Sequence, residues 1–371
     1  MTPLVSVIIP AYNAEGVIGE TLESIRRQVY RNIEVIVVND GSSDHTVEIV
    51  QAICKHDHRV KLLHQPRSGV AAARNTAIRH AKGEFIAPID ADDIWHPMNI
   101  EKQLECMLQS DETVGMTYAW SLDINEKGFP TGGFRVSNIK GYVYETLLSH
   151  NFLGNASASL IRRTCFEKIG GYSEQYRQAN AQGCEDWDLY LRIAEQYRFQ
   201  VVPEFLIGYR RMKNCMSKNY RTMAKSHRMM LDKVLCKYPN IYDIFFRLST
   251  VSLYAYFDED SSQNQAGARN MYWVRLSLQK DYILALLLHG FSKFISPYLK
   301  QTNSCESPAR SASAHAIDSV PDSMRAFKLC GNCKMSGVKF RALLSSFFHI
   351  FVKKIVSRHD SIVHLRSQRD K

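Results

Sequence analysis

The sequence lacks the features that mark several common classes of protein. Over its 371 residues it has no run of the ~20 mainly apolar residues that a membrane-spanning helix needs. The first ten residues have no basic segment and no small-residue cleavage site, so no signal peptide is predicted. The nine cysteines are odd in number and scattered, which argues against a secreted disulfide framework. We therefore expect a cytoplasmic protein.

Excess basic charge is absent from most of the chain, although the formal net charge is +10. Residues 324–371 contain eleven Lys and Arg but only two Asp, so this segment alone carries a net charge of +9. A domain that coats nucleic acid is basic over a whole face or stripe. The remaining residues have no such excess, and we expect no nucleic-acid partner.

Short apolar runs alternate with helical patterns over the first 90 residues. Strands are predicted at residues 5–9, 33–38, 60–64 and 84–89, and helices at 15–28, 46–52 and 70–81. Strands that alternate with helices of this length are typical of an α/β fold with a doubly wound, mostly parallel sheet flanked by helices. Ligands of such sheets bind outside the carboxyl ends of the strands. The polar residues that follow the first, second and fourth strands are therefore the first candidates for a site.

The pattern is less regular beyond residue 90. Helices are predicted at 97–108 and 165–171, strands near 114–121 and at 157–162, and a loop or hairpin at 123–136. A further helix begins at Glu185.

Three carboxylates follow the fourth predicted strand within four positions: Asp90, Asp92 and Asp93. Like charges this close need a neutralising partner, and a divalent cation such as Mg²⁺ or Mn²⁺ takes carboxylate oxygens together with substrate phosphates. An isolated D-x-D is more often an acidic turn at the end of a strand. The turn after the first strand has no G-x-G-x-x-G to hold a pyrophosphate, which argues against a nicotinamide dehydrogenase and leaves a bound metal as the substitute.

Four ordered segments of the chain resemble the motifs of one enzyme family. They are VSVIIPAYN at residues 5–13, VNDGSSD at 38–44, GVAAARN at 69–75 and DADD at 90–93. In this order and spacing they resemble glycosyltransferase family 2, whose members have the GT-A fold, and the resemblance covers about residues 4–217. It implies inverting transfer of a sugar from a nucleotide-sugar donor, with a UDP-sugar as the default, assisted by Mn²⁺ or Mg²⁺.

The resemblance also implies roles for individual residues at the strand ends. The residues expected to bind the donor are Pro10, Tyr12, Asn13, Asp40, Arg74 and Asp90. Asp40 would accept a hydrogen bond from the donor base, Tyr12 would lie against that base, and Arg74 would reach the ribose or the diphosphate. Asp92, together with Asp90, would hold the metal. From the residues alone, Tyr12 also fits an amphipathic aromatic at a strand end, and Arg74 a helix-face arginine over apolar surface.

Glu185, Asp186 and Trp187 begin a predicted helix whose Leu189 and Ile193 share one face. The helix dipole favours carboxylates in the first turn, which by itself accounts for an acidic pair there. The resemblance implies more. Asp186 would be the general base that takes the proton from the acceptor hydroxyl, Glu185 would orient the acceptor, and Trp187 would bind the acceptor as a platform for a sugar ring.

One position departs from the family pattern. The segment YRRMKNCMS at residues 209–217 resembles the closing element of the family, but Met212 stands where a histidine is frequent. That histidine can complete the metal or phosphate site, so here the metal would depend on the aspartates alone. Arg210, Arg211 or Lys213 could take over part of the phosphate contact.

The composition of the chain changes after the predicted catalytic domain at residues 1–218. Residues 219–300 are predicted to form a helical appendage, 301–323 a flexible linker, and 324–371 a basic amphipathic segment. The apolar residues of 336–358 fall on one helical face flanked by Lys and Arg. That pattern fits peripheral contact with the inner face of a membrane, and fits packing against protein about equally well.

These observations predict a glycosyltransferase of polysaccharide or lipopolysaccharide biosynthesis, with a glycan or a lipid-linked acceptor. One alternative is a non-catalytic nucleotide- or sugar-binding relative, which would tend to lose Asp40, Asp92 or Asp186, all of which are present. The other is a metal-dependent nucleotidyltransferase, which would release pyrophosphate rather than a nucleoside diphosphate.

Overall fold

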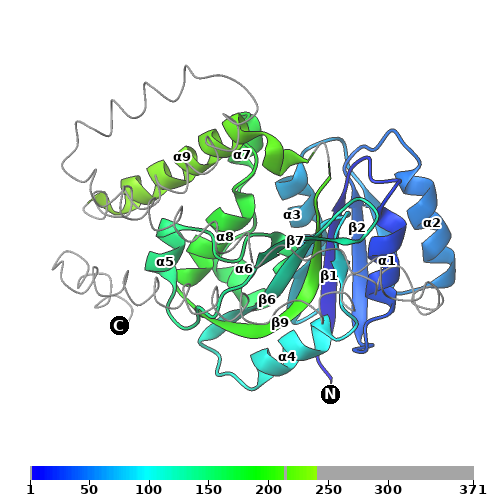
Figure 1. The fold of residues 1–371 in the computed structure, drawn as a ribbon, viewed down its shortest axis with the longest axis horizontal. Coiled ribbons are helices and arrows are strands. Elements are labelled where there is room, and N and C mark those ends of the chain that lie inside the picture. The colour runs from blue at the N-terminus through cyan, green and yellow to red at the C-terminus, as the bar shows by residue number, and fades with distance from the viewer. Residues whose placement is uncertain (1, 213–214, 240–371) are drawn as a thin grey trace.

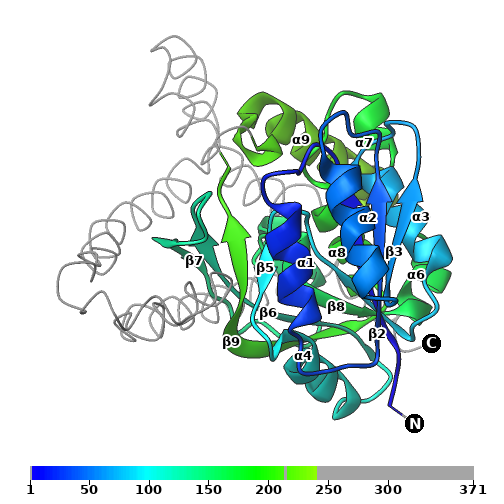
Figure 2. The ribbon, with the colours of Figure 1, turned by 90° about the vertical axis from the view of Figure 1, so that its right-hand side faces the viewer.

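A mixed β-sheet of nine strands forms the centre of the described part of the chain, residues 2–212 and 215–239 of a computed structural model. Its strands are ordered β3-β2-β1-β4-β8-β6-β9-β5, and β7 pairs with β6 outside this path. Helices cover both faces of the sheet (Figure 1, Figure 2). The predicted α/β class is confirmed.

The N-terminal half of the sheet is parallel, as predicted. Its strands are β1 (Val5–Ala11), β2 (Ile33–Asn39), β3 (Val60–His64) and β4 (Phe85–Pro88), connected by α1 (Ile18–Arg26), α2 (Thr46–His56) and α3 (Val70–His80). Parallel pairs join β1 to β2, β1 to β4 and β2 to β3. Every residue of β2 is buried, as a strand covered on both faces requires.

Two apolar cores lie on opposite faces of this parallel half. Successive residues of a strand point to opposite faces of the sheet. Ile8 and Ile36 therefore pack with the alanines of α3, whereas Val7 and Val35 pack with α1 and α2. Each core also contains residues from the second half of the chain, so both halves contribute to both cores.

The second half of the chain makes the sheet mixed. Its strands are β5 (Ile94–Trp95), β6 (Val114–Ile124), β7 (Pro130–Arg135), β8 (Ser159–Arg162) and β9 (Arg198–Arg210). β6 and β9 are parallel, but β8 runs antiparallel to both of its neighbours, β4 and β6. Because β8 runs antiparallel to β4, the start of β8 lies beside the end of β4. The 3-10 turn Ala156–Ala158 that precedes β8 is therefore found where β4 ends.

The remaining helices gather mainly at one end of the sheet. They are α4 (Asn99–Leu108), α5 (Tyr144–Ser149), α6 (Arg163–Ile169), α7 (Gln175–Gln178), α8 (Glu185–Ala194) and α9 (Tyr220–Lys237), and a 3-10 turn, Met216–Lys218, precedes α9. Figure 1 shows α5, α8 and α9 at the end opposite to α1 and α2. Met223, Met230 and Leu231 of α9 belong to the same core as Trp187 and Tyr190 of α8. Within the described residues, the predicted boundary after residue 218 therefore does not separate two cores.

Several local elements differ from the sequence-based prediction. The strand predicted near 114–121 continues to Ile124 and forms a hairpin with β7, which accounts for much of the predicted loop or hairpin at 123–136. The strand predicted at 157–162 begins as a 3-10 turn and is extended only from Ser159. β5, α5 and α7 were not predicted, because elements of two to six residues are too short to carry a recognisable period.

No helix within residues 2–212 and 215–239 is both long enough and apolar enough to cross a membrane. Most of the predicted appendage at 219–300, the linker at 301–323 and the segment 324–371 with its stripe at 336–358 lie outside the described residues.

Substitution of Leu231 tests the packing of α9. Its side chain is buried, so Leu231→Ala leaves a cavity, and we expect the free energy of unfolding to fall by about 2–4 kcal/mol. Urea denaturation followed by circular dichroism measures this change. The matched control is Arg228→Ala on the exposed face of α9, where the ion pair with Asp232 faces solvent and its loss changes the same quantity by less than about 1 kcal/mol. Equal, small effects of the two variants would contradict the shared core.

Candidate active site

The carboxyl ends of β1, β2 and β4 meet at one edge of the sheet. Pro10 pairs with Val38 inside the sheet, and Tyr12 follows directly on the end of β1. The backbone N–H of Asp40 donates to the carbonyl of Ala11 at 2.8 Å, which ties the ends of β1 and β2 together. The polar residues predicted to converge at this edge therefore do so.

Asn13 fastens the loop after β1 to the loop after β2. Its backbone is left-handed (φ 47°), a conformation that asparagine tolerates better than most residues. The N–H of Asn13 donates to Ser42 Oγ at 3.0 Å, and the N–H of Ser43 donates to Asn13 Oδ1 at 2.9 Å. In this structure Asn13 thus has a structural task, and its predicted contact with the donor remains a prediction.

The carboxylate of Asp40 joins the end of β2 to the start of α3. One oxygen accepts from the N–H of Ser68 (2.7 Å) and from Gln65 Nε2 (2.8 Å), and the other accepts from the N–H of Gly69 (2.7 Å). Gly69 has φ 95° and ψ 164°, a backbone conformation that is essentially restricted to glycine, so a side chain at this position would be strained. The sequence did not indicate this structural role of Asp40, because it depends on a turn 28 residues away.

Tyr12 carries an arginine on its ring. The Arg67 guanidinium lies 4.0 Å from the centroid of the Tyr12 ring, and both residues are exposed. A cation stacked on an aromatic face is favourable even at an exposed site. Arg67 is a member of the site that sequence reasoning missed, since no local pattern links residues that lie 55 positions apart.

Arg74 lies inside the site rather than over an apolar surface. Its side chain is 5% exposed, forms an ion pair with Asp90, and has its guanidinium carbon 5.0 Å from the ring centroid of Tyr172. Arg74 Nε has no hydrogen-bond partner within the described residues. A buried guanidinium with an unused donor is suited to an anionic or hydroxyl-bearing ligand.

The acidic cluster has the chemistry of a divalent-cation site. Burial, and next the charge of Asp90, raise the pKa of Asp92 to about 7. A divalent cation would compensate this repulsion, and carboxylate oxygens are ligands that Mg²⁺ and Mn²⁺ prefer. No group of three or more His, Cys, Asp and Glu suited to a metal occurs within residues 2–212 and 215–239. A cation held by Asp90 and Asp92 would take its other ligands from substrate phosphates and water.

Asp93 holds the acidic loop in place instead of facing a ligand. It is fully buried, and it accepts hydrogen bonds from Ser157 Oγ at 2.5 Å and from the N–H of Arg210 at 2.9 Å. Ser157 Oγ in turn accepts from the N–H of Asp90 at 3.0 Å. The turn that enters β8 is thus bonded to both ends of the acidic loop.

Glu185 and Asp186 occupy the first turn of α8, as predicted. Burial raises the pKa of Asp186, and the positive charge of Arg74 acts in the opposite direction. One Asp186 oxygen accepts from the N–H of Trp187 at 2.7 Å. Glu185 is 2% exposed, and its Oε1 has no hydrogen-bond partner among the described residues. The positive charge of Arg74 interacts with the carboxylates of both Asp90 and Asp186, so it connects the acidic cluster with the start of α8.

Trp187 does not have the predicted orientation. It is 2% exposed, its Nε1 donates to the carbonyl of Leu147 at 2.7 Å, and its ring centroid is 4.5 Å from that of His227. This buried position contradicts the predicted platform for a sugar ring. Trp187 instead connects α8 to α5 through Leu147 and to α9 through His227.

Arg210, the last residue of β9, and Arg211, which follows it, are both engaged with protein groups. The Arg210 side chain is fully buried, and Arg211 Nε lies 3.7 Å from Asp123 Oδ2. Arg210 is therefore not placed to contact a phosphate, contrary to the sequence-based suggestion. Met212 packs against the core formed with α1 and α2, and Lys213 lies outside the described residues.

Comparison with known proteins identifies the family of this chain. Residues 6–170 match the model of glycosyl transferase family 2. TuaG of Bacillus subtilis, named as a teichuronic acid biosynthesis glycosyltransferase, is 32% identical over 225 residues, which are 60% of this chain and 85% of TuaG. The chain belongs to glycosyltransferase family 2.

Other similar proteins align with the same part of this family 2 chain. Chondroitin synthase of Pasteurella multocida is 28% identical over 238 residues, which are 63% of this chain. The match spans only 23% of the length of that synthase. TarS of S. aureus, in a crystal structure with UDP-GlcNAc, is 20% identical with a TM-score of 0.49, over 62% of this chain and 66% of that chain.

Substitution of Asp40 tests its role at the start of α3. Asp40→Ala leaves the N–H groups of Ser68 and Gly69 without their acceptor, so we expect the free energy of unfolding to fall by about 1–3 kcal/mol. Chemical denaturation measures the loss. Glu48→Ala, in the exposed first turn of α2, is the control and should stay within about 0.5 kcal/mol of the unmodified protein. If Asp40→Ala were as mild as this control, the described bonds would not stabilise the fold.

Proposed function

We propose that this family 2 chain is an inverting glycosyltransferase that moves a sugar from a nucleotide-sugar donor to a hydroxyl group of a glycan or lipid-linked acceptor. The observation that carries the proposal is the placement of Arg74. Its buried guanidinium pairs with Asp90, a candidate metal ligand, and its charge also acts on Asp186, the candidate base. A leaving group held near Asp90 and a hydroxyl near Asp186 would thus meet in one region of the site.

Asp186 has the properties of a general base. An inverting transfer needs a carboxylate that deprotonates the incoming hydroxyl on one face of the sugar while the nucleoside diphosphate leaves from the other. Burial strengthens the basicity of Asp186, whereas Arg74 and the N-terminus of α8 favour its ionised form. The unpartnered Glu185 Oε1 could accept a hydrogen bond from the acceptor and orient it.

Asp90 and Asp92 are the residues that would hold Mn²⁺ or Mg²⁺. When bound, such a cation stabilises the charge that develops on a leaving diphosphate, which is worth several kcal/mol of the barrier. Arg74 limits the negative charge of the pair by neutralising Asp90. Asp93 is excluded from this role because Ser157 and Arg210 engage both of its oxygens.

The donor base is proposed to lie between the ends of β1 and β2, beside Tyr12 and Asp40. UDP is the default nucleotide, with GDP and dTDP as alternatives. The names of TuaG and chondroitin synthase support a place in the biosynthesis of a cell-envelope polysaccharide. Peripheral attachment to the inner face of the membrane through 336–358 is proposed from the sequence pattern alone.

Donor turnover tests the reaction class and its dependence on metal. We expect the full chain to release a nucleoside diphosphate from at least one of a panel of UDP-, GDP- and dTDP-sugars when Mn²⁺ is present. EDTA should reduce the rate to background, and added Mn²⁺ or Mg²⁺ should restore it, because the carboxylate pair provides few protein ligands. A nucleotidyltransferase would instead release pyrophosphate when it is given a nucleoside triphosphate and a sugar 1-phosphate, and would release no nucleoside diphosphate from the donors of the panel. No turnover with any of these substrates would support a non-catalytic relative.

Substitution of Asp186 tests the base. Asp186→Asn should lower kcat for transfer by about 10²- to 10⁴-fold, while donor binding measured by calorimetry changes little. The acidic limb of the pH–rate profile should lie above the ordinary aspartate pKa of about 3.9, because only the ionised carboxylate accepts a proton and burial raises its pKa.

Asp188→Asn is the matched control for Asp186→Asn, two positions along the same helix. Asp188 bonds to Tyr176, Arg192 and Lys233, so its loss should lower stability but leave the rate per folded molecule within a few-fold. Equal kcat in Asp186→Asn and the unmodified protein would remove Asp186 from the role of base.

A further inference from the structure

Arg210, at the end of β9, is a fully buried arginine next to the acidic loop. Its side chain is 0% exposed, which is rare for a charged residue unless its donors are all engaged. Glu20 of α1 is the carboxylate that pairs with it, and the glutamate side chain is 41% exposed. The reaction as proposed above assigns Arg210 no role.

The guanidinium of Arg210 bonds to three separate segments. Nε donates to the carbonyl oxygen of Asp92 at 2.7 Å, Nη1 donates to the carbonyl of Glu126 at 2.7 Å, and Nη2 donates to Glu20 Oε2 at 2.6 Å. The backbone N–H of Arg210 donates to Asp93 Oδ1 at 2.9 Å. One residue therefore fixes the backbone of the acidic loop on one side and the side chain of Asp93 on the other.

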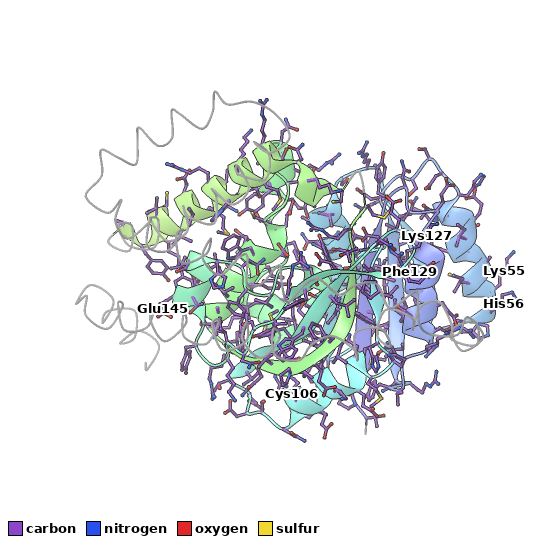
Figure 3. All side chains as sticks on the ribbon, viewed as in Figure 1. Lys55, His56, Cys106, Lys127, Phe129 and Glu145 are labelled. Carbon is purple, nitrogen blue, oxygen red and sulfur yellow. The ribbon has the colours of Figure 1, made fainter. Side chains whose placement is uncertain are left out.

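The third segment is the turn between β6 and β7. Glu126 lies in this turn, and Figure 3 labels its neighbours Lys127 and Phe129. Arg210 Nη1 also lies 3.4 Å from the carbonyl oxygen of Asn125. The turn and the acidic loop are 30 or more residues apart in sequence, yet they share the donors of one guanidinium, so the position of one depends on the position of the other.

The geometry of these bonds requires arginine rather than any cation. The bonds leave the guanidinium in different directions in its plane, toward two carbonyls and one carboxylate. A lysine ammonium is a single point of charge and cannot reach all three groups at once. Charge neutralisation alone would need no such fork, because a lysine beside Glu20 would supply it.

We propose that Arg210 is a positioning residue for the divalent cation. By holding the carbonyl of Asp92 and the carboxylate of Asp93, it sets the direction in which the Asp92 side chain leaves the loop, so that Asp92 and Asp90 can face the same ion. The inference rests on the proposed metal-assisted function. Residues that orient metal ligands without touching the metal commonly change metal affinity by 10- to 100-fold when they are substituted.

The test is Mn²⁺ binding, measured on the full chain by the loss of the free-ion electron paramagnetic resonance signal, with and without UDP. Arg210→Lys keeps the positive charge but cannot make all three bonds of the guanidinium. We expect the Kd of this variant for Mn²⁺ to rise by about tenfold or more. UDP binding in EDTA should stay unchanged, and high Mn²⁺ should partly restore donor turnover.

Arg162→Lys is the matched control. Arg162 also bonds to backbone carbonyls, those of Val114 and Met107, but it pairs with Phe85 at the start of β4, at the opposite edge of the sheet. A role in stability alone predicts that both variants lower the melting temperature and that neither changes Mn²⁺ affinity. Equal Mn²⁺ binding by Arg210→Lys and Arg162→Lys would therefore overturn the inference.

Glu20→Ala tests the same inference if Arg210→Lys does not fold. Glu20 is partly exposed in the first turn of α1, where alanine is compatible with the helix, and its loss frees Nη2 of Arg210. We expect Mn²⁺ binding to weaken by about threefold, in the same direction as for Arg210→Lys and by less, because the other bonds remain. Unchanged affinity would count against the inference. An unmodified protein that bound no Mn²⁺ would instead contradict the proposed metal-assisted function itself.

Discussion

Mutual repulsion among Asp90, Asp92 and Asp93 is the constraint to which the rest of the site is fitted. Three carboxylates within four positions, partly withdrawn from water, disfavour one another's charge, and the pKa of Asp92 rises accordingly. The chain meets this cost with groups from other elements: Arg74 of α3 pairs with Asp90, and Ser157 donates to Asp93. In the proposed function, a cation held by Asp92 and Asp90 would offset the repulsion that remains.

Two buried arginines flank this cluster and differ in how their donors are used. The Arg210 guanidinium donates to carbonyls of the surrounding loops and to Glu20, so its position in the fold is fixed. Arg74 has an unpartnered Nε within the described residues and lies against the ring of Tyr172. The bonds of Arg210 fix the positions of the loops around the cluster. The unpartnered Nε of Arg74 leaves a hydrogen-bond donor for a ligand. Burial alone would not have distinguished them, since both side chains are almost inaccessible to water.

The sequence was sufficient for the parts of the molecule that depend on local pattern. The four parallel strands, the three helices between them and the start of α8 at Glu185 follow from hydrophobic period and turn residues. Contacts between distant residues left no such signal. The bond from Arg210 to Glu20 spans 190 positions, and the burial of Trp187 depends on His227 of α9, so neither could be derived before the fold was known. The ordered motifs indicated which residues would converge at the ends of β1, β2 and β4, while the orientation of individual side chains required the structure.

The antiparallel insertion of β8 also sets the order in which the site can form. The outer edge of β4 pairs only through Phe85 and Ile86 with residues 161 and 162, and the loop bonds to Arg210 come later still. During synthesis, the acidic loop leaves the ribosome before these partner residues have been made. In that interval the unpaired edge of the apolar strand β4 can pair with other chains. Pairing with β8 closes this edge of β4, and β9, synthesised later, pairs with β6 and brings Arg210 to the acidic loop. The strand edge is thus protected at one stage of synthesis, and the acidic loop receives its bonds from Arg210 at a later one.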